Sequence, residues 1–204
     1  MSRPQIAVAL VHHPVCDRRG DIITTAVTNL DLHDIARTCR TYNVRRFYVV
    51  TPVIEQQRLV QRLLDHWCRG HGATHNPDRR NALEVVEVVD GLDDARGAWE
   101  RVCGRPVTPV LTGARTSGGT GYRQCREMAD ELPLLLVFGT GSGLAPSLFE
   151  QGWPVLDPIH GAGDYNHLSV RAAAAIIIDR LLAVDGGSQA GQAENKRPND
   201  QKGY

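Results

Sequence analysis

Apolar residues in this chain fall into short dense runs, which alternate with longer segments where apolar positions recur with helical period. Each run is rich in branched side chains, as is typical of strands buried on both faces. Strands are predicted over residues 6–11, 47–51, 84–89, 107–111, 134–138 and 154–157. Helices are predicted over residues 28–40, 56–68, 92–103, 121–132 and 169–183, with a loop over 70–78. This alternation, without internal repeats, predicts an α/β fold with a mainly parallel sheet and helices on both faces.

The helix predicted over residues 28–40 carries two different stripes. Apolar side chains repeat every three or four positions and predict a core-facing stripe of Leu32, Ile35, Ala36 and Cys39. Thr28 or Asn29 can cap the helix. A polar stripe lies on the adjacent flank and consists of Asn29, His33, Arg37 and Arg40. Two interpretations of the polar stripe stay open, a solvated surface or a set of donors for phosphate and ribose.

Glycine-rich turns follow three of the predicted strands. They are Thr112–Gly118, Gly139–Leu144 and Pro158–Gly163. Such turns let the backbone approach a ligand and turn its N–H groups inward, and loops at strand ends bind small molecules in open α/β sheets. A dinucleotide fingerprint is excluded, because Leu144 stands where its third glycine is required and no βαβ unit follows.

Composition limits the class of protein but does not identify a binding partner. The 204 residues carry no formal net charge, and all but two of the 23 basic residues are Arg. Arg favours planar phosphate and base contacts, although genome composition gives the same bias. Five scattered cysteines indicate reduced thiols. The chain has no long apolar run, and its start leads into a strand, so we expect a cytoplasmic protein without a membrane anchor. We expect a disordered tail over 185–204 after a single domain over 1–184.

No metal site is expected. His12 and His13 directly follow the first strand, but no carboxylate or thiolate stands at ligand spacing beside them. We interpret them as a loop histidine pair.

Three motifs, taken in order, resemble those of the SPOUT superfamily of S-adenosylmethionine-dependent RNA methyltransferases. The first is Asn29-Leu30 followed by Ile35 to Cys39, the second is Val137 to Leu144, and the third is His167 to Ala173. The resemblance spans about residues 5 to 184. It is closest to a bacterial group that is also found fused behind the tRNA guanine-N1 methyltransferase.

The resemblance implies a C-terminal deep trefoil knot, a bent S-adenosylmethionine (SAM) held in the knot, and a homodimer. It implies RNA as the substrate, with tRNA expected, and neither DNA nor a membrane as a partner. Arg37 is implied as the catalytic residue that orients the acceptor, supported by Asn29. The expected cofactor-binding residues are Leu111, Thr112, Gly113, Phe138, Gly139, Thr140, Gly141, Gly143, Leu144, Pro158, Ile159, His160, Gly161, Tyr165, Asn166, Leu168 and Ser169.

Two departures keep an alternative open. The SpoU-type ribose methyltransferases carry a Glu in the second motif, which here is Gly-Thr-Gly-Ser-Gly, and an Asn where this chain has Ser169. They also carry Ser where this chain has Arg171. The acceptor can therefore be a base nitrogen or a ribose oxygen, and a SAM-binding module or sensor without methyl transfer is the alternative function. A plain phosphate-binding enzyme is disfavoured, because no Lys or Asp stands beside the Gly139 loop.

Overall fold

Five parallel strands form the central sheet of the computed structural model, which describes residues 4–116, 119–163 and 165–183. The expected tail over 185–204 lies outside these residues. The strands run in the order β5 (Val86–Val89), β4 (Phe47–Val50), β1 (Ile6–Val11), β7 (Leu134–Gly139) and β6 (Thr108–Leu111). Every neighbouring pair is parallel. The prediction of an α/β fold with a mainly parallel sheet is confirmed.

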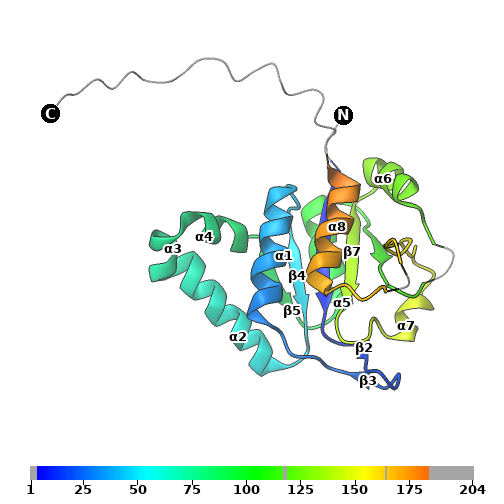
Figure 1. The fold of residues 1–204 in the computed structure, drawn as a ribbon. Helices are drawn as coiled ribbons and strands as arrows, with labels where there is room; N and C mark the ends of the chain where they lie inside the picture. The colour runs from blue at the N-terminus through cyan, green and yellow to red at the C-terminus, as the bar shows by residue number, and fades with distance from the viewer. Residues whose placement is uncertain (1–3, 117–118, 164, 184–204) are drawn as a thin grey trace, which may run out of the picture.

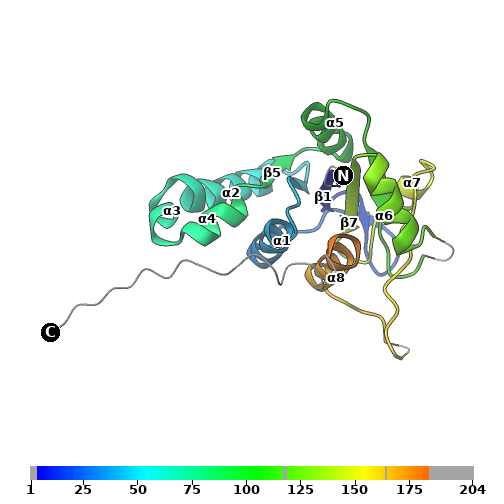
Figure 2. The same ribbon diagram turned by 90° about the horizontal axis from the view of Figure 1, so that it is seen from above.

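Helices cover both faces of the sheet, as predicted, but unequally. One face packs against α1 (Asn29–Thr41), α6 (Tyr122–Glu131) and α8 (Val170–Leu182), while α5 (Leu92–Cys103) lies on the other. Figure 2 shows α5 on one side of the strands and α1 and α8 on the opposite side. The stripe predicted for α1 is confirmed, since Leu32, Ile35, Ala36 and Cys39 are all buried.

Strand β1 lies at the centre and is buried along its whole length. Alternate side chains point to opposite layers, so Ile6, Val8 and Leu10 join the core beneath α1 and α8. The small residues Ala7 and Ala9 face the α5 layer, which contains the fully buried Trp99. The register pairs Ile6 with Leu134 and Val11 with Gly139, so β1 and β7 end together.

The segment between β4 and β5 is more helical than the sequence predicted. Helix α2 (Ile54–Leu64) continues into a π-helical turn, η1 (Asp65–Arg69), followed by α3 (His71–His75) and α4 (Pro77–Leu83). The predicted loop over 70–78 is therefore wrong. The Asn76 side chain accepts a hydrogen bond from the Arg79 N–H, and Pro77 opens the helix. This Asn-Pro pair is a signal for the start of a helix. It was missed because α4 is too short for its apolar residues to show a helical period.

Two further predictions need correction near the ends of the strands. Residues 154–157 form only isolated bridges, Leu111 with Val155 and Thr120 with Leu156, rather than a strand. An antiparallel hairpin, β2 (Val15–Cys16) and β3 (Ile22–Ile23), follows β1 where no strand was predicted. A short helix, α7 (Pro146–Phe149), was also not predicted. Figure 1 shows the hairpin and α7 at the same end of the sheet.

Within the described ranges, no helix combines the length and the apolar character that crossing a lipid bilayer requires.

Candidate functional site

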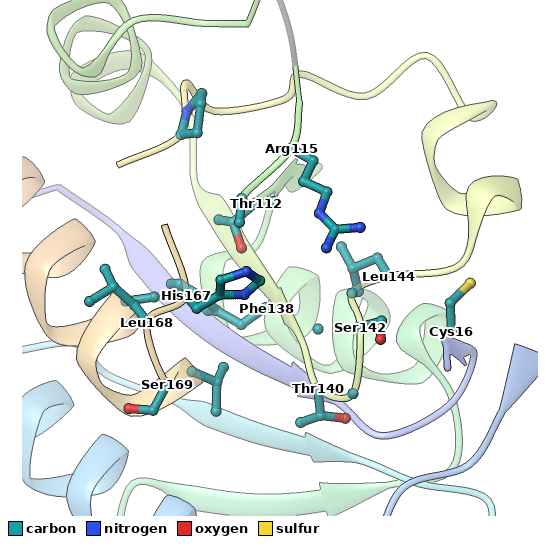
Figure 3. Close-up of a pocket in the computed structure, with 18 of the residues that line it drawn as sticks. Cys16, Thr112, Arg115, Phe138, Thr140, Ser142, Leu144, His167, Leu168 and Ser169 are labelled. Carbon is teal, nitrogen blue, oxygen red and sulfur yellow. The ribbon is translucent and has the colours of Figure 1, made fainter. Parts of the chain in front are cut away.

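A large cavity opens where β1, β7 and β6 end. From β1 the chain runs outward to β4 and β5 on one side, while β7 and β6 lie on the other, so the order of connection reverses between β1 and β7. Ligands of open α/β sheets bind at such a switch point. The cavity measures about 1350 Å³. Its walls come from the hairpin Cys16–Gly20, the segments Thr112–Thr116 and Phe138–Leu144, and the segment Asn166–Val170 that enters α8. Figure 3 shows side chains from all four segments around one space.

The glycines at the end of β7 and in the loop that follows it are required by the protein's own backbone. A Cβ on Gly139 would lie 2.6 Å from the Leu144 nitrogen, inside the loop itself. Gly141 has φ +61°, and its Cβ would lie 2.7 Å from the carbonyl oxygen of Cys16. The sequence suggested that these glycines make room for a ligand. In the structure their first role is to fold the loop tightly and seat it on the β2–β3 hairpin.

Most N–H groups of this loop already have partners within the protein. Thr140 N–H donates to the Val11 carbonyl at 3.2 Å, and Ser142 N–H donates to the Cys16 carbonyl at 2.8 Å. Gly143 N–H donates to the Thr140 carbonyl at 3.0 Å. The expected cradle of inward-facing N–H groups is therefore reduced. What lines the cavity from this segment includes the hydroxyl residues Thr140 and Ser142 and the apolar Phe138 and Leu144.

A chain of side-chain hydrogen bonds links the end of β1 to this loop. The Thr140 hydroxyl donates to the Val11 carbonyl at 3.0 Å and also contacts the Thr25 hydroxyl. The Thr25 hydroxyl also forms a hydrogen bond with Nδ1 of His12 at 3.1 Å. Hydrogen bonds thus connect His12 through Thr25 to Thr140. Both threonines line the cavity.

His12 and His13 lie after the end of β1 and outside any strand, as the loop interpretation predicted, but His12 is buried. Its side chain is fully buried, and burial lowers its pKa to about 4, although the nearby Asp31 charge acts in the opposite direction. The ring is therefore neutral at physiological pH. Nε2 has no hydrogen-bond partner within the described part of the chain.

The two remaining walls are tied to each other. The Asn166 amide donates to the Ala114 carbonyl at 3.3 Å, joining the segment before α8 to the segment after β6. Ser169 caps α8 by accepting from the Ala172 N–H at 3.3 Å. Ser169 therefore has a structural role at the position where the SpoU-type motif carries Asn.

Residues 154–157 run between two parts of the chain that both hold them by backbone hydrogen bonds. On one side, Leu111 N–H donates to the Pro154 carbonyl at 2.9 Å, and Leu156 N–H donates to the Leu111 carbonyl at 2.8 Å. On the other side, Thr120 N–H donates to the Val155 carbonyl, and Asp157 N–H donates to the Thr120 carbonyl at 3.0 Å. This segment thus passes between the two ends of the 111–120 connection.

Arg171 joins α8 to α1. Its Nη1 lies 3.1 Å from Oδ1 of Asp31, and its Nε lies 3.3 Å from Oδ2 of Asp34. Asp31 is buried, lines the cavity and also accepts from the Thr28 hydroxyl at 2.6 Å. The departure at position 171 therefore has a structural explanation, because this Arg neutralises an acid at the cavity wall.

Most of the expected cofactor-binding residues line the cavity, but six of the predicted site residues do not. The residues at the cavity are Thr112, Gly113, Phe138, Gly139, Thr140, Gly141, Gly143, Leu144, Pro158, Ile159, Asn166, Leu168 and Ser169. Leu111 is fully buried in the sheet, whereas His160, Gly161 and Tyr165 are exposed outside the lining. Asn29 and Arg37 are exposed on α1 and do not reach the cavity of their own chain.

The sequence did not single out the hairpin wall or Arg115. Cys16 to Gly20 line the cavity because a hairpin with two-residue strands folds back over the loop after β7. Strands this short carry no alternation that a pattern could show. Arg115 was not predicted as a site residue, because nothing in the neighbouring sequence distinguishes it from other exposed arginines. Among the residues that the structure describes, no three metal-ligating side chains come together.

Comparison with known proteins gives the same assignment as the motifs. A protein from Nitratidesulfovibrio vulgaris named tRNA (guanine-N(1)-)-methyltransferase is 47% identical over 177 residues, 85% of this chain. The chain spans only 41% of that relative's length. An uncharacterized protein from Aquifex aeolicus is 40% identical over 186 residues, covering 90% of this chain and 91% of its own.

The fold is shared more widely. The structure of a methylase family protein from Haemophilus influenzae superposes with a TM-score of 0.57 at 18% identity, covering 96% of this chain and 72% of that one. Residues 5–183, nearly the whole described chain, match the model of a family described as SAM-dependent RNA methyltransferase. The chain therefore belongs to the family of SAM-dependent RNA methyltransferases.

Proposed function

We propose that this chain binds SAM in the cavity at the ends of β1, β7 and β6 and methylates RNA there, with tRNA as the substrate. The observation that carries the proposal is the position and size of this cavity. Ligand pockets commonly measure about 300–1,000 Å³, and this one measures about 1350 Å³. It therefore has room for a cofactor and for an acceptor nucleotide beside it. The name of the Nitratidesulfovibrio relative supports tRNA.

The residues of the cavity fit the chemistry of SAM. Its adenine is apolar on both faces, and its ribose carries hydroxyl groups. Phe138, Leu144 and Leu168 offer apolar surface, while Thr112 and Thr140 add hydroxyl groups. When bound, SAM supplies a sulfonium methyl group that the acceptor atom can attack in line. The chain's own residues bind and orient the two reactants, and the hydrogen bonds from His12 through Thr25 keep the loop at Thr140 in place.

We also propose that the domain over residues 1–184 contains the trefoil knot. The support is the passage of residues 154–157 between Leu111 and Thr120, with backbone hydrogen bonds on both sides. A knot requires a later segment to pass through a loop that an earlier segment has closed. Knots are rare in proteins in general. A segment held on both sides by an earlier part of the chain is therefore an unusual arrangement, and it supports the proposed knot.

We further propose a homodimer, in which the Asn29 and Arg37 side chains of one copy act at the cavity of the other. Both residues are exposed on α1 and lie outside the cavity of their own chain. Helix α8 packs beside α1, and its neighbouring Ala172, Ala175 and Ile176 remain only partly buried. A second copy that covers these two helices would bury this apolar surface and supply Arg37 to the acceptor.

A single-turnover assay tests the proposed function. Purified protein with methyl-labelled SAM is mixed with total tRNA from a strain that lacks the gene. We expect label to enter RNA, and nucleoside mass spectrometry then identifies the modified base or ribose. SAM binding with no label in this tRNA would overturn the proposal and favour the sensor function.

A further inference from the structure

Three arginines stand at the mouth of the cavity without carboxylate partners. Arg18 and Arg19 lie in the β2–β3 turn, and Arg115 follows β6; all three are exposed and line the cavity. Over residues 4–116, 119–163 and 165–183, none of them forms an ion pair with Asp or Glu. Figure 3 shows the Arg115 guanidinium extending over the space toward Leu144 and Ser142. The three positive charges therefore remain available to an anion.

Asp17, the acidic residue next to Arg18 in the sequence, stabilises the β2–β3 turn instead of pairing with these arginines. Oδ1 of Asp17 accepts hydrogen bonds from the N–H groups of Arg19 at 2.7 Å and Asp21 at 3.0 Å. These bonds fix the turn so that it carries Arg18 and Arg19 along the cavity rim. The chain has no net charge, so these arginines are a local feature of the rim and not part of a generally basic surface.

An exposed aromatic ring stands beside the same rim. The Tyr165 side chain is 80% exposed, although large aromatic rings are usually buried. Its only described ring neighbour is His167, with centroids 5.3 Å apart, and His167 lines the cavity. Figure 3 shows the His167 ring lying inside the space. His167 thus lines the cavity, and Tyr165 lies outside the lining.

We propose that this rim binds the RNA acceptor as a single-stranded, unstacked nucleotide. Arg18, Arg19 and Arg115 hold backbone phosphates on either side of it, and Tyr165 stacks on a base next to the reacting one. Guanidinium groups bind phosphate in a planar two-point contact. Stacking on an aromatic side chain requires a base that is free of its helix. The assignment rests on the proposed function, and it defines the substrate as a loop or bulge rather than a duplex.

One other anion could occupy the same arginines, namely the carboxylate of SAM itself. Two features favour phosphate. The three side chains are exposed and come from two loops nearly a hundred residues apart, which suits an extended polyanion better than one carboxylate. The exposed Tyr165 lies outside the cavity lining. SAM bound inside the cavity would not contact this ring, whereas an RNA that extends beyond the cavity would.

The test compares four proteins: Arg18→Gln/Arg19→Gln, Arg115→Gln, Tyr165→Ala and Tyr165→Phe. The control is Arg101→Gln/Arg126→Gln, which removes two exposed charges from α5 and α6, away from the cavity. Three quantities are measured for each protein. They are SAM affinity by calorimetry, binding of a short labelled single-stranded RNA across a salt series, and single-turnover methylation of tRNA lacking the modification.

We expect SAM affinity to be unchanged in every variant. RNA binding should weaken in the arginine variants, with a salt dependence shallower by about 0.7 per lost phosphate contact. Tyr165→Ala should weaken RNA binding about tenfold, while Tyr165→Phe keeps the ring and binds as wild type does. Methylation at limiting RNA should fall in parallel with binding, and the control should match the wild type.

Two results would overturn the assignment. One is a loss of SAM affinity in Arg115→Gln with RNA binding intact. That result would show that Arg115 binds the carboxylate of SAM and not RNA phosphate. The other is wild-type RNA binding and salt dependence in all rim variants. If the wild-type protein binds SAM but methylates no RNA, the proposed function fails, whereas the RNA-binding measurements still decide whether the rim is an RNA site.

Discussion

Gly139 shows how closely the loop after β7 is packed. A side chain at this position would press on the backbone nitrogen of Leu144 at 2.6 Å, and backbone cannot give way as a flexible side chain can. We expect Gly139→Ala to destabilise the fold by about 1–3 kcal/mol and to lower SAM affinity, because Leu144 must move at the cavity wall. Urea unfolding and calorimetry measure the two effects.

The matched control is Gly163→Ala, since a Cβ there meets open space. It should leave both the unfolding free energy and SAM affinity unchanged. Equal behaviour of the two variants would show that the loop tolerates the displacement and that the packing argument is wrong.

His12 makes a second prediction, about pH. Its pKa is about 4 in the folded protein and about 6.5 in the unfolded chain, so the unfolded state binds the additional proton between these values. The stability that depends on neutral His12 is complete above pH 6.5 and is lost as pH falls toward 4. The expected loss is roughly 2–4 kcal/mol.

Comparison with His12→Asn isolates this contribution, because the acidic groups titrate in both proteins. Asn can still donate a hydrogen bond toward Thr25 but has no proton to gain. We expect the wild-type curve of unfolding free energy against pH to be steeper between pH 6.5 and 4. Parallel curves would mean that the imidazole is not held neutral by its burial.

At the scale of elements, Arg171 is the polar connection between α1 and α8. Replacing it with Met keeps an aliphatic stem but leaves Asp31 buried without its cation. We expect Arg171→Met to cost about 1–3 kcal/mol of unfolding free energy and to raise the KM for SAM more than it lowers kcat. The reason is that Asp31 and the start of α8 both line the cavity.

Arg126→Met on α6 is the control, because Arg126 is exposed and outside every ion pair in the described chain. A double variant, Asp31→Asn with Arg171→Met, should recover part of the lost stability by removing the orphaned charge. If the double variant is no more stable than Arg171→Met, the buried carboxylate is not the source of the loss.

Elements with a clear apolar period were predicted well from the sequence, and elements without one were not. The strands of the sheet and helices α1, α5, α6 and α8 have buried faces that their patterns record. The hairpin β2–β3 and helices α3 and α4 are too short to show a period. Residues 154–157 have the composition of a strand, but their partners, Leu111 and Thr120, depend on tertiary position alone.

At the scale of the whole molecule, the proposed homodimer yields a test by mixing. Arg37→Ala leaves the cavity of its own chain intact, whereas Gly139→Ala damages it. Arg37→Ala alone should lose methyl transfer about 100-fold or more, as expected for the loss of a positioned polar group, and Gly139→Ala alone should lose it through weaker SAM binding. Co-expressed copies should regain up to one working site per mixed dimer.

The mixed sample is compared with each variant at the same total concentration, and analytical ultracentrifugation reports the assembly. No recovery in a mixture proven to contain mixed dimers would place Arg37 at its own cavity or outside the reaction. A monomer at micromolar concentration would remove the homodimer itself. The sequence could suggest Arg37 through its motif, but not its distance from the cavity, because that depends on a surface pairing no single-chain pattern encodes.

The order of strands in the sheet has a consequence for how the protein is made. Strand β1 is synthesised before the other strands of its sheet, yet its second neighbour, β7, is encoded more than a hundred residues later. Until then one edge of a wholly apolar strand has unpaired N–H and C=O groups, which is the condition that favours aggregation. The half-synthesised chain is therefore more exposed to aggregation than the folded protein, in which β1 has a neighbour on both sides.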